Sequence, residues 1–151
     1  MDPSSGQFAA LQVVQVRLQT FERRSLSRPR VLLADDHPTL LEAEKALLSP
    51  YFDVVETVTD GAALVSEARR LVPDVIVTDI SMPILNGIDA VHELHASGST
   101  AKIVFLTVHR ESDFVEACME TGALGYVQKL SMKHHLVPAI QAALAGHSYV
   151  S

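Results

Sequence analysis

The sequence predicts an α/β protein with a doubly wound, five-stranded parallel sheet, built as a (βα)5 repeat. Three observations support this prediction. Short apolar runs of strand length recur from residue 30 onwards, stretches with apolar residues at helical spacing separate them, and proline, glycine or capping residues mark the boundaries. Continuous apolar runs are typical of strands buried on both faces, and the right-handed crossovers between parallel strands leave a doubly wound sheet.

The first two strands flank the first helix. An apolar run at residues 31–34 gives the first strand, and Pro38 suits the first turn of a helix because the N–H that proline lacks is not needed there. Pro50 stops this helix, whose apolar face consists of Leu40, Leu41, Leu47 and Leu48. The second strand, at residues 52–57, interleaves polar residues, so we expect it at an edge of the sheet.

The middle of the chain continues the alternation. Asp60 can cap a second helix, which Pro73 ends and whose apolar face is formed by Leu64, Ala68 and Leu71. The third strand is expected at residues 74–78. Pro83 and Gly87 mark the loop after it, and the third helix then carries Ile88, Val91 and Leu94.

Two further strand–helix pairs complete the repeat. The fourth strand is expected at residues 102–106, followed by a helix that Gly122 closes and that carries Phe114, Cys118 and Thr121. The fifth strand is expected at residues 124–127. Ser131 can cap the last helix, which Gly146 ends and which carries Leu136, Ile140 and Leu144.

The N-terminal extension, residues 1–29, lacks this alternation. Its segment 8–24 fits a helical stripe of Leu11, Val14, Leu18 and Phe21, but it also fits the alternation of a strand. Two interpretations follow: a flexible arm, or an amphipathic helix that docks on this domain or on a second copy.

Composition limits the function. A chain of 151 residues with 48% hydrophobic and 20% charged residues can bury the core of one domain. The formal net charge of −6 argues against DNA binding by this chain alone. The single cysteine, Cys118, excludes an internal disulfide and a cysteine-rich metal site. No apolar run reaches the roughly 20 residues of a membrane span, and no signal peptide is indicated, so we expect a cytoplasmic protein.

Polar residues stand where four of the predicted strands end. Asp35 and Asp36 follow the first strand, Asp79 the third, Thr107 the fourth and Lys129 the fifth. The carboxyl ends of parallel strands share one edge of a sheet, which is also where such folds bind ligands. Three carboxylates, a hydroxyl and an ammonium group together are suited to a divalent cation and a phosphoryl group. The sequence therefore predicts a phosphoryl-transfer site at this edge.

Four motifs carry a resemblance to a known family. They are the run DDHP at residues 35–38, DISMP at 79–83 with NG at 86–87, Thr107, and GYVQK at 125–129. With these motifs, residues 30–147 resemble a response-regulator receiver domain, a fold with the flavodoxin-like strand order 2-1-3-4-5. The ending AGHSYVS further resembles the receiver half of NarL/LuxR-type regulators. The resemblance thus implies that residues 148–151 begin a linker to a helix-turn-helix output domain that is absent from this chain.

The resemblance implies roles for the site residues. Asp79 would accept a phosphoryl group from a sensor histidine kinase. Asp36 and Asp79 would bind Mg²⁺, or Mn²⁺ in its place, together with the backbone carbonyl of Ser81, and Asp35 would act through water. Mg²⁺ favours such hard oxygen ligands.

The remaining roles concern charge and switching. Thr107 would hydrogen-bond a phosphoryl oxygen, and Lys129 would neutralise charge on Asp79 and then on the phosphoryl group. Tyr126 stands where the family carries its switch aromatic, so phosphorylation would alter the surface next to the fifth strand and favour a homodimer. DNA would be bound only through the absent output domain.

Other functions remain open. A stand-alone receiver would act by protein contacts alone. A Mg²⁺-dependent aspartyl-phosphate phosphatase normally needs a second acid two residues after the nucleophile, where Ser81 stands here. A flavin-binding module would need a phosphate-cradling loop where Asp35 and Asp36 lie. We therefore expect a receiver that catalyses only its own phosphorylation and dephosphorylation, and not an enzyme.

Overall fold

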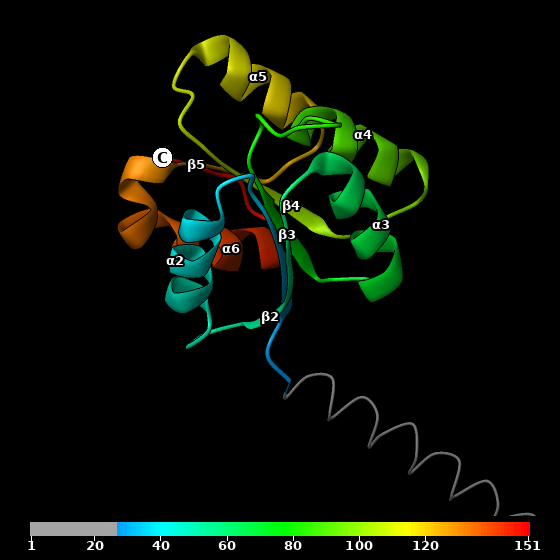
Figure 1. Cartoon of the computed structure of the whole chain (residues 1–151). Helices are drawn as coiled ribbons and strands as arrows, with labels where there is room; N and C mark the ends of the chain where they lie inside the picture. The colour runs from blue at the N-terminus through cyan, green and yellow to red at the C-terminus, as the bar shows by residue number, and fades with distance from the viewer. Residues whose placement is uncertain (1–26) are drawn as a thin grey trace, which may run out of the picture.

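A parallel sheet forms the middle layer of the structure, a computed structural model that describes residues 27–151 (Figure 1). Its strand order is β2-β1-β3-β4-β5-β6, and every neighbouring pair is parallel. The strands are β1 (Arg30–Ala34), β2 (Asp53–Val58), β3 (Val75–Thr78), β4 (Lys102–Thr107), β5 (Gly125–Gln128) and β6 (Tyr149–Val150). The order 2-1-3-4-5 predicted for the first five strands is confirmed, with β2 at an edge.

Helices cover both faces of this sheet. Figure 1 shows α2 and α6 on one side and α3, α4 and α5 on the other, as a doubly wound fold requires. The helices are α2 (Pro38–Leu48), α3 (Gly61–Leu71), α4 (Gly87–Ala96), α5 (Ser112–Glu120) and α6 (Met132–Leu144), with a single 3₁₀ turn, η1 (Lys129–Ser131), before the last. Residues 1–26 of the predicted N-terminal extension, including the segment 8–24, lie outside the described residues.

Two apolar clusters, one on each face, hold the layers together. Alternate residues of the central strands point to opposite faces, so Leu32 packs toward α3, α4 and α5, whereas Val31 and Leu33 pack toward α2 and α6. All residues of β3 are buried. Burial on both faces explains why β1, β3 and β4 read as continuous apolar runs in the sequence.

Several helix ends carry the local signals that were predicted for them. The Asp60 carboxylate accepts a hydrogen bond of 2.7 Å from Ala63 N, which confirms it as the cap of α3. Pro38 stands in the first turn of α2 as expected. Ser131 stands at the N-cap position of α6 as expected, but its side chain makes no cap bond and its Oγ instead donates to Gln128 O at 3.3 Å.

A sixth strand was not predicted. Residues 148–151 were expected to begin a linker, but Tyr149–Val150 pairs with β5, and the Tyr149 hydroxyl lies 2.6 Å from His135 Nδ1 on α6. Tyr149 N donates to Leu124 O at 2.8 Å. A two-residue strand has too little sequence for an alternation to show, whereas the open edge of β5 offers backbone groups that need partners.

Gly87 packs the start of α4 directly against the end of β3. Its N–H donates to Ile80 O at 2.7 Å, and a Cβ built at this position would lie 1.9 Å from Asp79 O. Asp79 O is a backbone atom, so rotation of a side chain cannot relieve the clash with an added Cβ. We therefore expect Gly87→Ala to lower the free energy of unfolding by about 3 kcal/mol, measured by urea denaturation. The control Gly98→Ala meets no atom within 4 Å and should lose only about 1 kcal/mol, from its positive φ. Equal losses would contradict the packing argument.

Candidate functional site

Four predicted site residues meet at the carboxyl edge of the sheet. Asp35 directly follows β1, Asp79 follows β3, and Lys129 begins the 3₁₀ turn after β5. One ligand atom from each of Asp35, Asp36, His37 and Asp79 lies within 4.8 Å of the others. The sheet order explains this meeting, because β3 and β1 are neighbours and Lys129 reaches across from β5.

Lys129 joins two of the acids. Its ammonium nitrogen lies 2.6 Å from Asp35 Oδ2 and 2.8 Å from Asp79 Oδ2. The three side chains are 9%, 1% and 5% exposed, so water screens these charges little. Burial alone would lower the pKa of Lys129, but the contacts with Asp35 and Asp79 outweigh it, and the pKa is raised above its ordinary value. The lysine therefore stays charged in its buried position.

The Asp79 carboxylate is fixed in orientation. Its Oδ1 accepts a hydrogen bond of 2.7 Å from Ile80 N, and its Oδ2 faces Lys129. The Asp79 backbone is anchored as well, since its N–H donates to Ala34 O at 2.9 Å. A carboxylate held at both oxygens presents its remaining lone pairs in a defined direction, which is what an in-line nucleophile needs.

His37 takes part in the acidic cluster, although no role was predicted for it. Its Nδ1 lies 3.0 Å from Asp35 Oδ1 and 3.0 Å from Asp36 Oδ1. Since carboxylates only accept, this nitrogen must carry the hydrogen. Its backbone N–H also donates to Asp35 Oδ1 at 2.9 Å. The Asp36 side chain is 33% exposed and is the carboxylate of the three that solvent reaches most easily.

The donor set fits a divalent cation. Asp35 Oδ2 and Asp36 Oδ1 are buried and form no hydrogen bond of acceptable angle, although each has a nitrogen within 3.0 Å. These oxygens and Asp79 offer hard, negatively charged ligands close together, the kind that Mg²⁺ prefers. One ammonium group faces three carboxylates, so a cation would relieve the remaining repulsion. The predicted ligand role of the Ser81 carbonyl stays a prediction.

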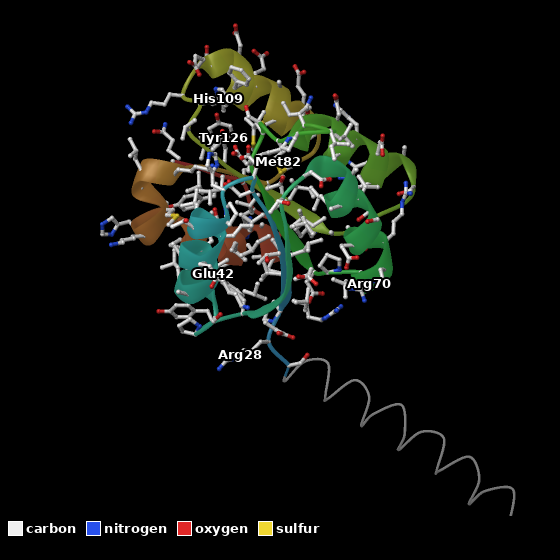
Figure 2. All side chains as sticks on the ribbon, in the orientation of Figure 1. Arg28, Glu42, Arg70, Met82, His109 and Tyr126 are labelled. Carbon is white, nitrogen blue, oxygen red and sulfur yellow. The ribbon has the colours of Figure 1, made fainter. Side chains whose placement is uncertain are left out.

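Thr107 and Tyr126 connect to the loop after β4 and not to the acids. Thr107 Oγ1 accepts a hydrogen bond from His109 N at 3.3 Å, and the Tyr126 hydroxyl donates to His109 O at 2.6 Å. The His109 ring lies 3.1 Å from Ser81 Oγ through Nε2 and stacks on Phe114 of α5 with centroids 4.1 Å apart. Figure 2 labels His109 and Tyr126. Burial raises the pKa of Tyr126 to about 12, so it remains a donor.

Besides the role of His37, sequence reasoning missed a second residue near the site. Glu44, on the inner face of α2, is 1% exposed, and its Oε1 has no hydrogen-bond partner. The pKa of Glu44 is raised to about 8, chiefly by burial, with the charges of Asp35 and Asp79 adding to the increase and that of Lys129 opposing it. A signal was available, because Glu44 lies three residues after Leu41 and four before Leu48, on the same buried face.

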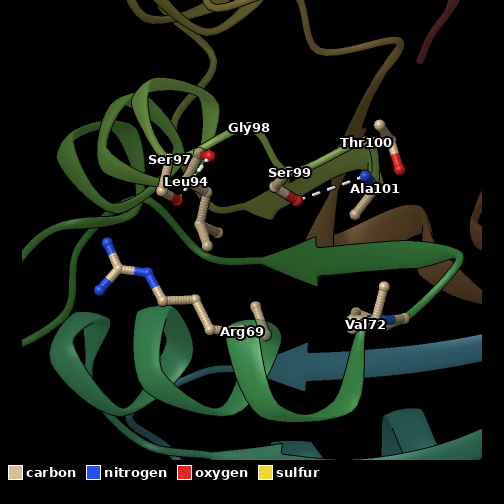
Figure 3. A pocket seen from close by; sticks show the side chains of 10 residues that line it. Arg69, Val72, Leu94, Ser97, Gly98, Ser99, Thr100 and Ala101 are labelled. Carbon is tan, nitrogen blue, oxygen red and sulfur yellow. Dashed lines mark hydrogen bonds between the residues drawn. The ribbon is translucent and has the colours of Figure 1, made fainter.

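One hollow on the surface adjoins the acidic cluster, and another lies away from it. One of about 220 Å³ lies between the ends of α3 and α4 and is lined by residues such as Val72, Leu94 and Ser97 (Figure 3). It is remote from the acids and lined mainly by small and aliphatic side chains, so it does not suggest chemistry. Another, lined by His37, Thr39, Leu40, Ala43, Val108 and Lys129, adjoins the acidic cluster.

Among residues 27–151, no helix has the length and apolar character to cross a membrane.

Comparison with known families identifies the class of protein. The model of the response regulator receiver domain matches residues 31–141, well over half of the chain. The chain therefore belongs to the response regulator receiver family. A receiver domain is a module of two-component signalling and not an enzyme.

Individual relatives narrow this identification to regulators of the NarL/LuxR type. The nitrate/nitrite response regulator protein NarP of Escherichia coli (strain K12) is 37% identical over 124 residues, which cover 81% of this chain and 58% of NarP. The transcriptional regulatory protein MctR of Rhizobium johnstonii is 33% identical over 124 residues, with 81% and 58% covered. The chain thus spans 58% of the length of these two relatives.

Solved structures agree with this class. A LuxR-family two-component response regulator from an Aurantimonas species superposes with a TM-score of 0.77 and 35% identity, covering 82% of this chain and 89% of that one. The isolated receiver domain of RcsB from Salmonella enterica gives a TM-score of 0.76 and 25% identity, with 83% and 94% covered.

Glu44 should make stability depend on pH. Its folded pKa of about 8 lies above the ordinary 4.5, so between these values the folded protein binds more protons than the unfolded chain. The contribution of Glu44 to the free energy of unfolding is therefore most favourable below pH 4.5 and falls as pH rises toward 8, with a slope of at most about 1.4 kcal/mol per pH unit.

We expect Glu44→Gln to gain stability relative to wild type as pH rises from 4.5 to 8, measured by urea unfolding. Glu42→Gln, exposed on the same helix, should show a constant difference from wild type. Parallel pH profiles for wild type and Glu44→Gln would contradict the assignment.

Proposed function

We propose that this receiver accepts a phosphoryl group from a sensor histidine kinase on Asp79. The observation that carries the proposal is the geometry of this carboxylate, held by Ile80 N at 2.7 Å and by Lys129 at 2.8 Å beside two further acids. Asp35 is likewise contacted by Lys129 at 2.6 Å and by His37 N at 2.9 Å, so the choice of Asp79 rests also on the DISMP motif, in which Asp79 stands where the receiver family carries its phosphoacceptor. The RcsB receiver structure was determined with the phosphomimetic BeF3⁻, which supports the same chemistry for a similar chain.

The residues of the site have separate roles in the phosphoryl transfer. An Asp79 oxygen attacks phosphorus, an O–P bond forms, and the P–N bond to the donor histidine breaks with its electron pair passing to the imidazole nitrogen. Lys129 already faces Asp79 Oδ2 and offsets the negative charge that two approaching anions would share. Asp35, Asp36, Asp79 and the Ser81 carbonyl would hold Mg²⁺ or Mn²⁺, whose charge offsets that of the phosphoryl oxygens. Catalysis is then positioning and charge neutralisation.

Phosphorylation would reach the surface through the loop after β4. Thr107 would exchange its bond with His109 N for one with a phosphoryl oxygen. Since the Tyr126 hydroxyl holds His109 O at 2.6 Å, a shift of this loop acts on Tyr126 and on α5, where Phe114 stacks on His109. A local charge change thereby biases a surface next to β5 between two states, and the activated surface forms a homodimer.

The regulator controls transcription through a domain that is separate from this receiver. NarP is a response regulator and MctR a transcriptional regulatory protein, each longer than the part that the chain matches. A net charge of −6 does not suit contact with DNA phosphates, so a helix-turn-helix domain would bind DNA. We infer that the whole regulator works in the cytoplasm, where the kinase transfers its phosphoryl group.

The kinase would dock beside the acids. The hollow next to the acidic cluster is lined by the apolar Leu40, Ala43 and Val108 together with Lys129. Val108 in this lining is 66% exposed, and Leu130, the neighbour of Lys129 in the chain, is 84% exposed, so apolar side chains are available to a partner on this surface. An amphipathic helix carrying the phosphohistidine could place apolar residues there while its histidine reaches Asp79.

Incubation with Mg²⁺ and acetyl phosphate tests the proposal. We expect the mass of one phosphoryl group, stable in acid and labile in base, to appear at Asp79 and to be absent from Asp79→Asn. Mg²⁺ should also raise the melting temperature of wild type by mass action, and should do so less for Asp36→Ala, which lacks a ligand. Modification of another residue, or equal Mg²⁺ shifts in both proteins, would contradict the assignment.

Tyr126→Phe tests the switch. The variant removes only the hydroxyl that holds His109 O, so we expect a loss of about 1 kcal/mol in the free energy of unfolding. Phosphorylation of Asp79 should be unchanged, whereas dimerisation with beryllofluoride, followed by size-exclusion chromatography, should weaken. Tyr51→Phe alters a tyrosine that is 55% exposed and serves as the control. Loss of phosphorylation in Tyr126→Phe would exclude this role.

A further inference from the structure

The chain turns back onto the outer edge of β5 directly after α6. Gly146 has a φ of +82°, and its N–H donates to Ala143 O at 3.0 Å. The next N–H, that of His147, donates to Ala142 O at 2.8 Å. This pair of bonds is a common helix ending, in which glycine supplies the positive φ at low cost. The turn directs residues 148–151, which we call the C-terminal strap, along β5, where they form β6.

The strap bonds the part of β5 that lies between the switch residue and the acidic site. Ser151 N donates to the carbonyl of Tyr126 at 2.9 Å, and Ser151 Oγ accepts from Gln128 N at 3.2 Å. Gln128 directly precedes Lys129, whose ammonium group lies 2.8 Å from Asp79 Oδ2. A movement at this end of β5 therefore acts on the strap.

The remaining contacts of the strap are few. Tyr149 N donates to Leu124 O at 2.8 Å, and the Tyr149 hydroxyl lies 2.6 Å from His135 Nδ1 on α6. Val150 is 55% exposed, and β6 is only two residues long. A short segment that buries little apolar surface opens at a lower free energy than the central strands do. The strap can consequently detach while the rest of the sheet stays folded.

Tyr126 is held from two sides. Its buried side chain donates from the hydroxyl to His109 O at 2.6 Å, and its backbone carbonyl accepts from Ser151 N. In the proposed switch, the loop that carries His109 shifts and acts on Tyr126. Hydrogen bonds weaken steeply when their angle departs from linearity, so a displaced Tyr126 does not keep Ser151 N in line.

We propose that the C-terminal strap is a conformational restraint, which stabilises the resting position of Tyr126 and is released when Asp79 is phosphorylated. The inference rests on the proposed function, because it names a device that regulates the same site. The strap acts through β5. Docking of the strap and binding of a phosphoryl group then oppose each other, and by thermodynamic linkage each weakens the other by the same factor.

Proline substitutions within the strap test this restraint. Ser151→Pro removes the N–H that bonds Tyr126 O. Val150→Pro is the matched control: Tyr149 N and Ser151 N both face β5, so the N–H between them points away, where an edge strand accepts proline. In calorimetric titrations of the full chain with beryllofluoride in excess Mg²⁺, we expect Ser151→Pro to bind about fivefold more tightly than wild type. Val150→Pro should stay within about twofold.

A milder variant and a measurement on wild type support the same test. Tyr149→Phe removes only the hydroxyl next to His135 and should bind beryllofluoride about threefold more tightly. The exposed Tyr51→Phe should stay within about twofold. In wild type, beryllofluoride should lower the hydrogen-exchange protection of the Ser151 amide by about fivefold. The amide of Val77, in the buried central strand β3, should keep its protection.

Three results would overturn the inference. They are equal or weaker beryllofluoride binding by Ser151→Pro, a gain that Val150→Pro shares, and unchanged protection of the Ser151 amide. If Ser151→Pro fails to fold, Tyr149→Phe decides, and wild-type affinity in that variant rejects the strap. Absence of beryllofluoride binding in wild type would reject the proposed function and the strap with it, whereas normal binding by wild type with any of the three results rejects the strap alone.

Discussion

The ion pairs of Lys129 with Asp35 and Asp79 are the interaction on which the carboxyl edge of this sheet depends. Three acids gathered within a few ångströms would repel one another, and one buried ammonium group partly balances them. In the sheet, β1 and β5 lie on either side of β3 and β4, and this order lets Lys129, after β5, contact both Asp35 and Asp79. The strand order therefore determines how the charges of the site are balanced. The site is consequently held together and still has a negative excess, which favours a bound cation.

The loop after β4 connects this charged edge with the remainder of the molecule. Its residue His109 contacts both predicted switch residues through its backbone, and it contacts Ser81 and Phe114 through its ring. One short segment therefore shares contacts with the end of β3, with β5 and with α5. Because each contact is directional, a displacement of the loop cannot leave all of them intact, and this gives the domain a physical basis for two alternative arrangements.

The meeting of Asp35, Asp36, Asp79 and Lys129 was predictable because parallel strands bring their carboxyl ends to one edge, whatever the loops do. The partners of Thr107 and Tyr126 were not, since they depend on the path of a loop that carries no periodic signal. Glu44 was overlooked for a different reason. Acids are normally exposed on helices, and only its spacing from Leu41 and Leu48 indicated otherwise. The metal ligand role of Ser81 and the N-terminal segment remain predictions.

The short strand β6 has a consequence for how copies of this domain can associate. It uses backbone groups along the outer edge of β5: Tyr149 N bonds Leu124 O, Ser151 N bonds Tyr126 O, and Ser151 Oγ accepts from Gln128 N. β6 therefore occupies backbone groups of β5 that a foreign peptide or a second sheet would otherwise use to add a strand. A partner that meets this stretch of β5 contacts complementary side chains, which can discriminate among partners, and not unpaired main-chain groups, which cannot.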